Sequence, residues 1–270
     1  MCHLSLLGMS CANETLMGQL ENLKAVIKGR PVAILLPGPS IQQLEDRIEE
    51  IKTLDLCYAS VNDFGVMESQ ILGKIGKRCE LVLCAAKECG VPNLKHRDYL
   101  QRPELNIFFT EEKSFHAELK RYKRNFGNRL FFFTTDVLYA SLLCPSTEQP
   151  FHFFAQASFV ALTCLALAGG ADTIIYFGAD GGSRELVNKG NQDAPLYYKG
   201  WKSDSAFRLG YDTGVVNMTA GRIVYQAANT YQREKYRIIN CSRETFYAPF
   251  PIANYDKCFE LLKQDYGKVS

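Results

Sequence analysis

The residues best suited to ligand chemistry follow the first apolar segment of the chain, in the run Pro-Gly-Pro-Ser at 37–40. Gly38 and Pro39 form the turn, and Ser40 opens a polar segment with a helical pattern. Glycine lets a ligand approach the backbone closely, and the start of a helix offers unpaired N–H groups that attract anions. Ser40 and Gln43 also match a capping box, which needs no ligand. The turn is therefore interpreted either as a phosphate cradle or as a helix cap.

Two later turns carry carboxylates just after apolar segments. Asn62 and Asp63 follow the segment 54–61, and Asp180 lies in the run Gly-Ala-Asp-Gly-Gly that begins at Gly178. Asn62 can hydrogen-bond a base, a ribose or a phosphate, and carboxylates are ligands that Mg²⁺ prefers. We expect Asn62, Asp63 and Gly178 at a nucleotide, and Asp63 and Asp180 at a metal. The alternative for each is an ordinary N-cap or turn-forming residue.

A long polar segment at 181–217 is the third candidate region. It is rich in glycine and contains Tyr197, Tyr198 and Trp201, the last being the single tryptophan of the chain. Loops of this length inside compact domains are usually functional or disordered, and the aromatic residues favour function. We therefore expect a lid or substrate loop, with Asp212 as a weaker catalytic candidate beside Asp180.

Several familiar catalytic signatures are missing from the sequence. It contains neither a P-loop nor the dinucleotide fingerprint, and neither the GxSxG nor the HExxH motif. His152 stands in an aromatic cluster, where a core residue is a commoner interpretation than a catalytic base. Phosphate-type turns without a nucleophile favour group transfer by positioning and charge stabilisation.

Composition limits the classes of partner and the compartment. The 270 residues are 47% hydrophobic and 22% charged, with a net charge of +2, so neither nucleic acid nor an anionic membrane is an expected partner. The ten cysteines lack zinc or iron–sulfur spacing, and several lie in apolar segments. There is no apolar run long enough for a transmembrane segment and no basic start typical of a secretory signal. A reducing, cytoplasmic location is the simplest expectation.

Apolar segments alternate with amphipathic ones along the whole chain. Strands are expected at 31–36, 54–61, 79–84, 106–110, 129–134, 172–178 and 236–241, and helices near 13–28 and at 41–52, 155–168 and 219–234. Many strand segments are apolar at consecutive positions, as strands covered on both faces require. The sequence therefore predicts an α/β fold: one Rossmann-like domain over 1–270, with a mostly parallel sheet, helices on both faces and an N-terminal helical segment within 1–30.

The order of these motifs resembles the MptE-like family, whose archaeal members include 6-hydroxymethyl-7,8-dihydropterin diphosphokinase. The resemblance covers residues 30–245 and is carried by "GPS" at 38–40, by "ADTIIYFGAD" at 171–180 and by the late strand in "YRIINCSRE". It implies a nucleotide whose phosphates lie at Gly38–Ser40, with Asp180 near the reacting centre. A carboxylate such as Asp180 or Asp63 would hold Mg²⁺ while ATP donates a diphosphate to a hydroxymethyl pterin.

The same core is similar to that of bacterial sialyltransferases and flagellin-modifying glycosyltransferases. Those enzymes contact a CMP-activated sugar through a Gly-Pro-Ser turn and an Asn after the second strand, which Gly38–Ser40 and Asn62 match. They often use a loop His as general base, and the segment 181–217 has none, so Tyr197, Tyr198 or an Asp would have to replace it. The open alternatives are a diphosphokinase with a small-molecule acceptor, a glycosyltransferase with a glycan acceptor, and a non-catalytic nucleotide-binding module.

Overall fold

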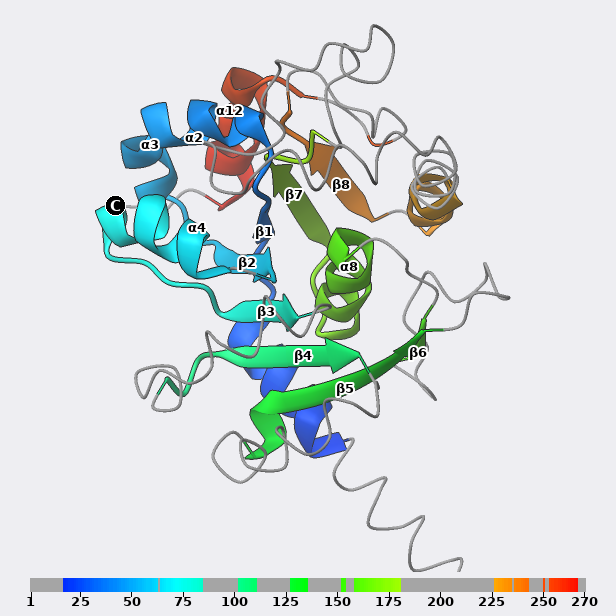
Figure 1. The fold of residues 1–270 in the computed structure, drawn as a ribbon. Helices are drawn as coiled ribbons and strands as arrows, with labels where there is room; N and C mark the ends of the chain where they lie inside the picture. Colours follow the sequence, from blue (N-terminus) through cyan, green and yellow to red (C-terminus); the bar gives the residue numbers. More distant parts are fainter. Residues whose placement is uncertain are drawn as a thin grey trace, which may run out of the picture.

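The computed structural model describes residues 17–62, 64–84, 102–110, 127–135, 152–153, 158–180, 226–234, 236–242, 250 and 253–266. Within these residues eight strands form one sheet, and every paired neighbour is parallel (Figure 1). They are β1 (Val32–Leu35), β2 (Cys57–Val61), β3 (Leu81–Cys84), β4 (Asn106–Thr110), β5 (Leu130–Thr135), β6 (His152–Phe153), β7 (Thr173–Phe177) and β8 (Arg237–Asn240). Their order across the sheet is β6-β5-β4-β3-β2-β1-β7-β8. The predicted α/β, Rossmann-like fold is confirmed.

Consecutive apolar residues in the strands supply two separate cores. In β1, Ala33 and Leu35 belong to one core, whereas Val32 and Ile34 belong to the other, and all four side chains are fully buried. Successive side chains of a strand point to opposite faces of the sheet, so a strand covered on both faces must be apolar at every position. The uninterrupted apolar segments of the sequence are therefore explained by burial on both faces.

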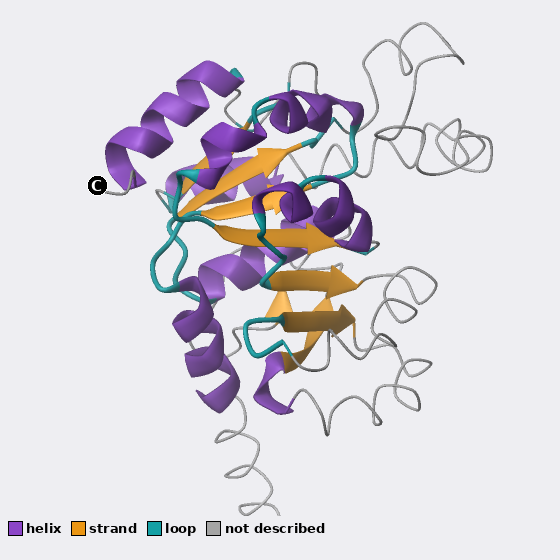
Figure 2. Cartoon of the chain, turned by 90° about the vertical axis from the view of Figure 1, so that its left-hand side faces the viewer, coloured by secondary structure: helices purple, strands orange, loops and turns teal. Residues whose placement is uncertain are grey.

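Helices cover each face of the sheet (Figures 1 and 2). One face carries η1 (Pro39–Ile41), α2 (Gln42–Asp46), α3 (Ile48–Lys52), α4 (Phe64–Gln70), η2 (Leu72–Ile75) and α12 (Tyr255–Tyr266). The other face carries α8 (Ser158–Ala168) and the helical residues 17–27 and 226–233. A short helix, η4 (Gly127–Arg129), leads into β5. In the described part of the chain, no helix is long and apolar enough to cross a membrane.

One predicted helix differs from the structure, and the elements α4, α12 and β6 were not predicted. The helix expected at 41–52 is divided at Arg47, where the backbone has φ −118° and ψ 24°. The Arg47 guanidinium lies 5.2 Å from the ring centre of Phe259 and 2.5 Å from a carboxylate oxygen of Asp256, so the interruption coincides with a contact to α12. Helix α12 itself was not predicted. It begins after Asn254, whose side-chain oxygen accepts the N–H of Lys257 at 2.9 Å, a standard N-cap.

Candidate functional site

The strand order reverses between β1 and β7, which defines a topological switch point. Helix α2, which follows β1, contributes Leu44 to one core. The helical residues before β8 contribute Ala227 to the other core, so the two connections lie on opposite faces of the sheet. Ligands of open parallel sheets bind outside the carboxyl ends of the strands at such a point. The turns at Gly38–Ser40 and Gly178–Asp180 both lie there, as the sequence predicted.

The two turns approach each other as closely as their backbones permit. The N–H of Gly38 donates to the carbonyl oxygen of Gly178 at 3.0 Å, and the N–H of Leu36 donates to that of Phe177 at 2.8 Å. A Cβ atom on Gly38 would lie 2.3 Å from the Gly178 carbonyl oxygen and 2.4 Å from Oδ2 of Asp180. Gly178 has a φ of +74°, and a Cβ there would lie 2.1 Å from the carbonyl oxygen of Leu36. Both glycines are therefore required by close packing of the two turns.

Asp180 supplies the cap of the helix that follows β1. The N–H of Ser40 donates to Oδ2 of Asp180 at 2.8 Å, and Asp180 is only 6% exposed. The residue at the N-cap position is Gly38, which offers no side chain, and Ser40 lies inside η1. The capping-box interpretation of Ser40 and Gln43 is therefore wrong, because the cap comes from a carboxylate on β7's turn.

This arrangement restricts how a phosphate can bind at the turn. A phosphate that took the Ser40 N–H would have to displace the Asp180 carboxylate, and a phosphate beside it would suffer like-charge repulsion. A divalent cation between the two anions removes that repulsion. Mg²⁺ takes oxygen ligands and commonly uses one or two carboxylates together with substrate phosphates, so Asp180 could supply one ligand of such a cation. The Ser40 hydroxyl oxygen is also buried and has no hydrogen-bond partner within the described residues.

Three polar residues at this edge were not among the predicted site residues. The Tyr255 hydroxyl of α12 donates to the Ser40 carbonyl oxygen at 3.3 Å. Asn240 ends β8, and its Oδ1 accepts the N–H of Ser242 at 3.0 Å while its Nδ2 lies 3.5 Å from the carbonyl oxygen of Ala179. Asn240 and Ser242 could have been found, because they end a predicted strand. Tyr255 could not, since nothing in the local sequence indicates where α12 packs.

Of the other candidate residues, Asn62 and His152 lie within the described residues. Asn62 ends β2, the strand beside β1, and its N–H donates to the Leu83 carbonyl oxygen at 2.7 Å. Its φ of 51° is left-handed, which is uncommon outside glycine although asparagine tolerates it. His152 lies in β6, and four strands separate β6 from β1. The candidates Asp63, Tyr197, Tyr198, Trp201 and Asp212, and the whole segment 181–217, lie outside the described residues.

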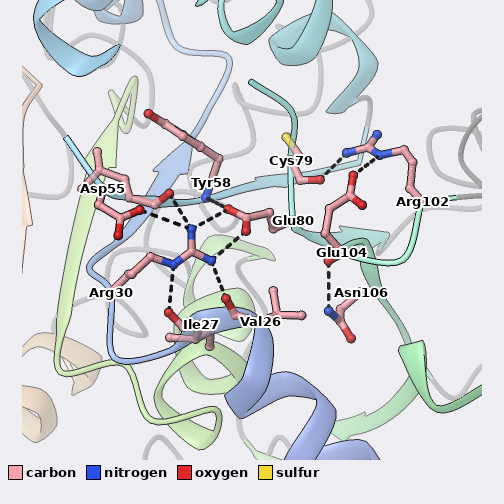
Figure 3. A network of polar contacts seen from close by, with 11 residues as sticks. Val26, Ile27, Arg30, Asp55, Tyr58, Cys79, Glu80, Arg102, Glu104 and Asn106 are labelled. Atoms are coloured by element: carbon pink, nitrogen blue, oxygen red, sulfur yellow. Dashed lines mark hydrogen bonds and ion pairs between the residues drawn. The ribbon is translucent and has the colours of Figure 1, made fainter. Parts of the chain in front are cut away.

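A second polar cluster occupies the opposite, amino edge of the sheet (Figure 3). Arg30 Nη2 lies 2.7 Å from Oε1 of Glu80, and Oε2 of Glu80 accepts the N–H of Tyr58 at 3.2 Å. Arg102 Nη1 lies 2.7 Å from Oε1 of Glu68. Both arginines also donate to backbone carbonyl groups, those of Leu56 and Cys79 among them. These contacts connect the residues that precede β1, β3 and β4, so the cluster holds the amino ends of the strands in place.

The described residues show no preformed metal centre, and the chain matches no known family. Within the described residues, no group of three or more His, Cys, Asp or Glu side chains is arranged to hold a metal ion. A scan against models of protein families finds no match to this chain, and searches of curated proteins and of solved structures find none either. A function is therefore inferred from the residues at the carboxyl edge.

Proposed function

We propose that the protein is a nucleotide-dependent transferase of the diphosphokinase type, which uses ATP and Mg²⁺ and a hydroxymethyl pterin-type acceptor. The supporting observation is the Asp180 carboxylate on the Ser40 N–H, at the switch point between β1 and β7. A carboxylate at that position is unfavourable for a bare phosphate and favourable for a phosphate accompanied by a divalent cation. If the resemblance to the MptE-like family holds, the nucleotide phosphates would lie at the same turn.

The proposed reaction transfers the terminal diphosphate of ATP. The acceptor hydroxyl oxygen attacks the β-phosphorus, the bond from that phosphorus to the α–β bridging oxygen breaks, AMP leaves, and the hydroxyl proton is released. The Gly38–Ser40 turn would bind and orient the phosphates at the carboxyl edge of the sheet, where β1 ends. Asp180, with the Ser40 hydroxyl beside it, would hold Mg²⁺, which supplies charge neutralisation on the phosphates. Positioning and electrostatic stabilisation account for most catalysis of phosphoryl transfer.

A second candidate is a glycosyltransferase that uses a CMP-activated sugar. The observation that favours it is Asn62, which has a left-handed backbone at the end of β2. Strained or unusual backbone positions are concentrated at ligand sites, and the resemblance to sialyltransferases assigns a nucleotide contact to an Asn at this place. In that case the Asp180 carboxylate would bind a hydroxyl of the ligand, and metal would not be needed.

Thermal unfolding in the presence of nucleotides separates these proposals, because a ligand that binds only the folded state raises the melting temperature. ATP with Mg²⁺ is compared with ATP plus chelator and with CMP, CDP, UDP and GDP. We expect the largest shift from ATP with Mg²⁺, and release of AMP once 6-hydroxymethyl-7,8-dihydropterin is added. A shift from CMP that is independent of Mg²⁺ supports the glycosyltransferase. A shift without turnover of any acceptor supports a non-catalytic binding module, and no shift with any nucleotide contradicts all three.

A further inference from the structure

Helix α12, near the end of the chain, contributes a side chain to the turn that follows the first strand. The Tyr255 hydroxyl donates to the carbonyl oxygen of Ser40 at 3.3 Å, across 215 residues of sequence. The N–H of Ser40 donates to Oδ2 of Asp180 at 2.8 Å. Ser40 is therefore held on both sides, through its N–H by the turn after β7 and through its C=O by α12.

The Tyr255 side chain is well fixed for this contact. It is 4% exposed, and its ring centre lies 5.6 Å from that of Phe177, the last residue of β7, and 6.3 Å from that of Phe259. Burial is the main cause that raises the pKa of the Tyr255 phenol, and the nearby charge of Asp180 raises it further. The phenol therefore keeps its proton at neutral pH and remains a hydrogen-bond donor.

Helix α12 is itself anchored to the helices that follow Ser40. Arg47 contacts Asp256 through an ion pair of 2.5 Å, and Lys263 Nζ lies 3.2 Å from Oε2 of Glu50. Figure 1 shows α12 beside α2 on the same side of the sheet. These contacts place Tyr255 over the turn without any contribution from a ligand, so the position of the hydroxyl is set by the fold.

We propose that Tyr255 is a positioning residue of the candidate site, which holds Ser40 so that its N–H stays on the Asp180 carboxylate and its hydroxyl is available to the bound cation. The proposal rests on the proposed function for the identity of the ligand. Hydrogen bonds to the N–H and to the carbonyl oxygen of Ser40 restrict its backbone, and hence the direction of its Cα–Cβ bond. A site that is preorganised in this way binds its ligand without first ordering the turn.

The test compares two substitutions that each remove one phenol oxygen from α12. Tyr255→Phe removes the contact to Ser40, whereas the control Tyr266→Phe removes a hydroxyl that contacts Oγ1 of Thr173 at 3.1 Å, at the amino end of β7. Titration calorimetry with ATP and Mg²⁺ is expected to show about five- to tenfold weaker binding for Tyr255→Phe, the effect of one hydrogen bond. For Tyr266→Phe we expect a change below about twofold. Wild-type affinity in Tyr255→Phe would overturn the proposal.

A spectroscopic measurement distinguishes failure of the positioning role of Tyr255 from failure of the proposed function. The amide resonance of Ser40, recorded without nucleotide, should move in Tyr255→Phe and stay in place in Tyr266→Phe. If the wild-type protein binds no nucleotide, the proposed function fails, and the Ser40 resonance alone tests whether Tyr255 positions Ser40. A resonance that moves in Tyr255→Phe then supports this role, and one that does not move overturns it.

Discussion

The backbone N–H of Ser40 donates a hydrogen bond of 2.8 Å to the carboxylate of Asp180, and this bond joins the turns after β1 and β7. It places a buried negative charge at the switch point of the sheet. Hydrogen bonds to an ionised acceptor are about twice as strong as neutral ones, so the contact also stabilises the fold. The same carboxylate thus has a structural role and, under the proposed function, would favour a phosphate that is accompanied by a divalent cation.

Gly38→Ala tests how closely the two turns must approach. The added methyl would lie 2.3 Å from the Gly178 carbonyl oxygen, which is backbone and cannot rotate away. We expect the free energy of unfolding to fall by about 1–3 kcal/mol, the usual cost of overpacking, and nucleotide binding to weaken. Urea denaturation and calorimetry measure the two effects.

Gly73→Ala in η2 is the matched control for that substitution. Its methyl would lie 3.0 Å from the Glu68 carbonyl oxygen, a contact that a small shift relieves, and η2 leads to the amino end of β3. Gly73→Ala should lower the free energy of unfolding less than Gly38→Ala does, and it should leave nucleotide affinity unchanged. Equal stability losses in the two variants would show that the turns are not closely packed at Gly38.

Glu80→Ala should destabilise the protein without affecting the candidate site. It leaves Arg30 without its closest carboxylate in a pair whose side chains are only 18% and 17% exposed. Breaking such a largely buried pair is expected to cost about 2–4 kcal/mol. The control Glu49→Ala removes the partner of Lys52 from an exposed pair and should cost less than about 0.5 kcal/mol. If Glu80→Ala weakened nucleotide binding as strongly as it lowered stability, a purely structural role of the amino edge would be contradicted.

Stability should fall in alkaline solution because of buried tyrosines. Burial raises the pKa of Tyr58 and that of Tyr176 above the ordinary value. Below about pH 10 both phenols are protonated in the folded and unfolded states, so their contribution is fully present. At higher pH the unfolded chain loses these protons first, and stability declines by up to about 1.4 kcal/mol per pH unit for each phenol.

Melting temperatures recorded from neutral to alkaline pH test this expectation. Tyr176→Phe removes one of the two phenols, and Oγ1 of Thr163 still donates to the Phe159 carbonyl oxygen at 2.8 Å. The variant should therefore lose less stability than the wild type as the pH rises past about 10. The same alkaline loss in both proteins would mean that the Tyr176 phenol ionises equally in the folded and unfolded chain.

Most of the sheet could be predicted from the sequence because its strands are buried on both faces. The expected segments 31–36 and 172–178 contain β1 (Val32–Leu35) and β7 (Thr173–Phe177). Strand β6 is two residues long and gives too short a pattern to recognise. Helix α12 carried a recognisable signal, an Asn cap before buried residues at helical spacing, among them Tyr255, Phe259 and Leu262.

The edge of the sheet that carries the turns could be predicted, whereas the contacts between them could not. Carboxyl ends of parallel strands lie at one edge, so the turns with Gly38 and Asp180 were expected at the same edge. That Asp180 caps Ser40, and that Tyr255 contacts the Ser40 carbonyl group, depends on packing between segments 140 and 215 residues apart. Local patterns carry no information about such contacts, so Ser40 and Gln43 were open to interpretation as a self-contained cap.

The most direct test of the account is ATP binding by the wild type and by Asp180→Asn, measured by calorimetry with Mg²⁺ and with a chelator. The asparagine keeps an oxygen that can accept the Ser40 N–H but has no negative charge. We predict that Mg²⁺ tightens ATP binding to the wild type by about tenfold or more, and changes binding to Asp180→Asn by less than about twofold. Equal binding to the wild type with and without Mg²⁺, or full Mg²⁺ dependence in Asp180→Asn, would contradict a cation held by Asp180.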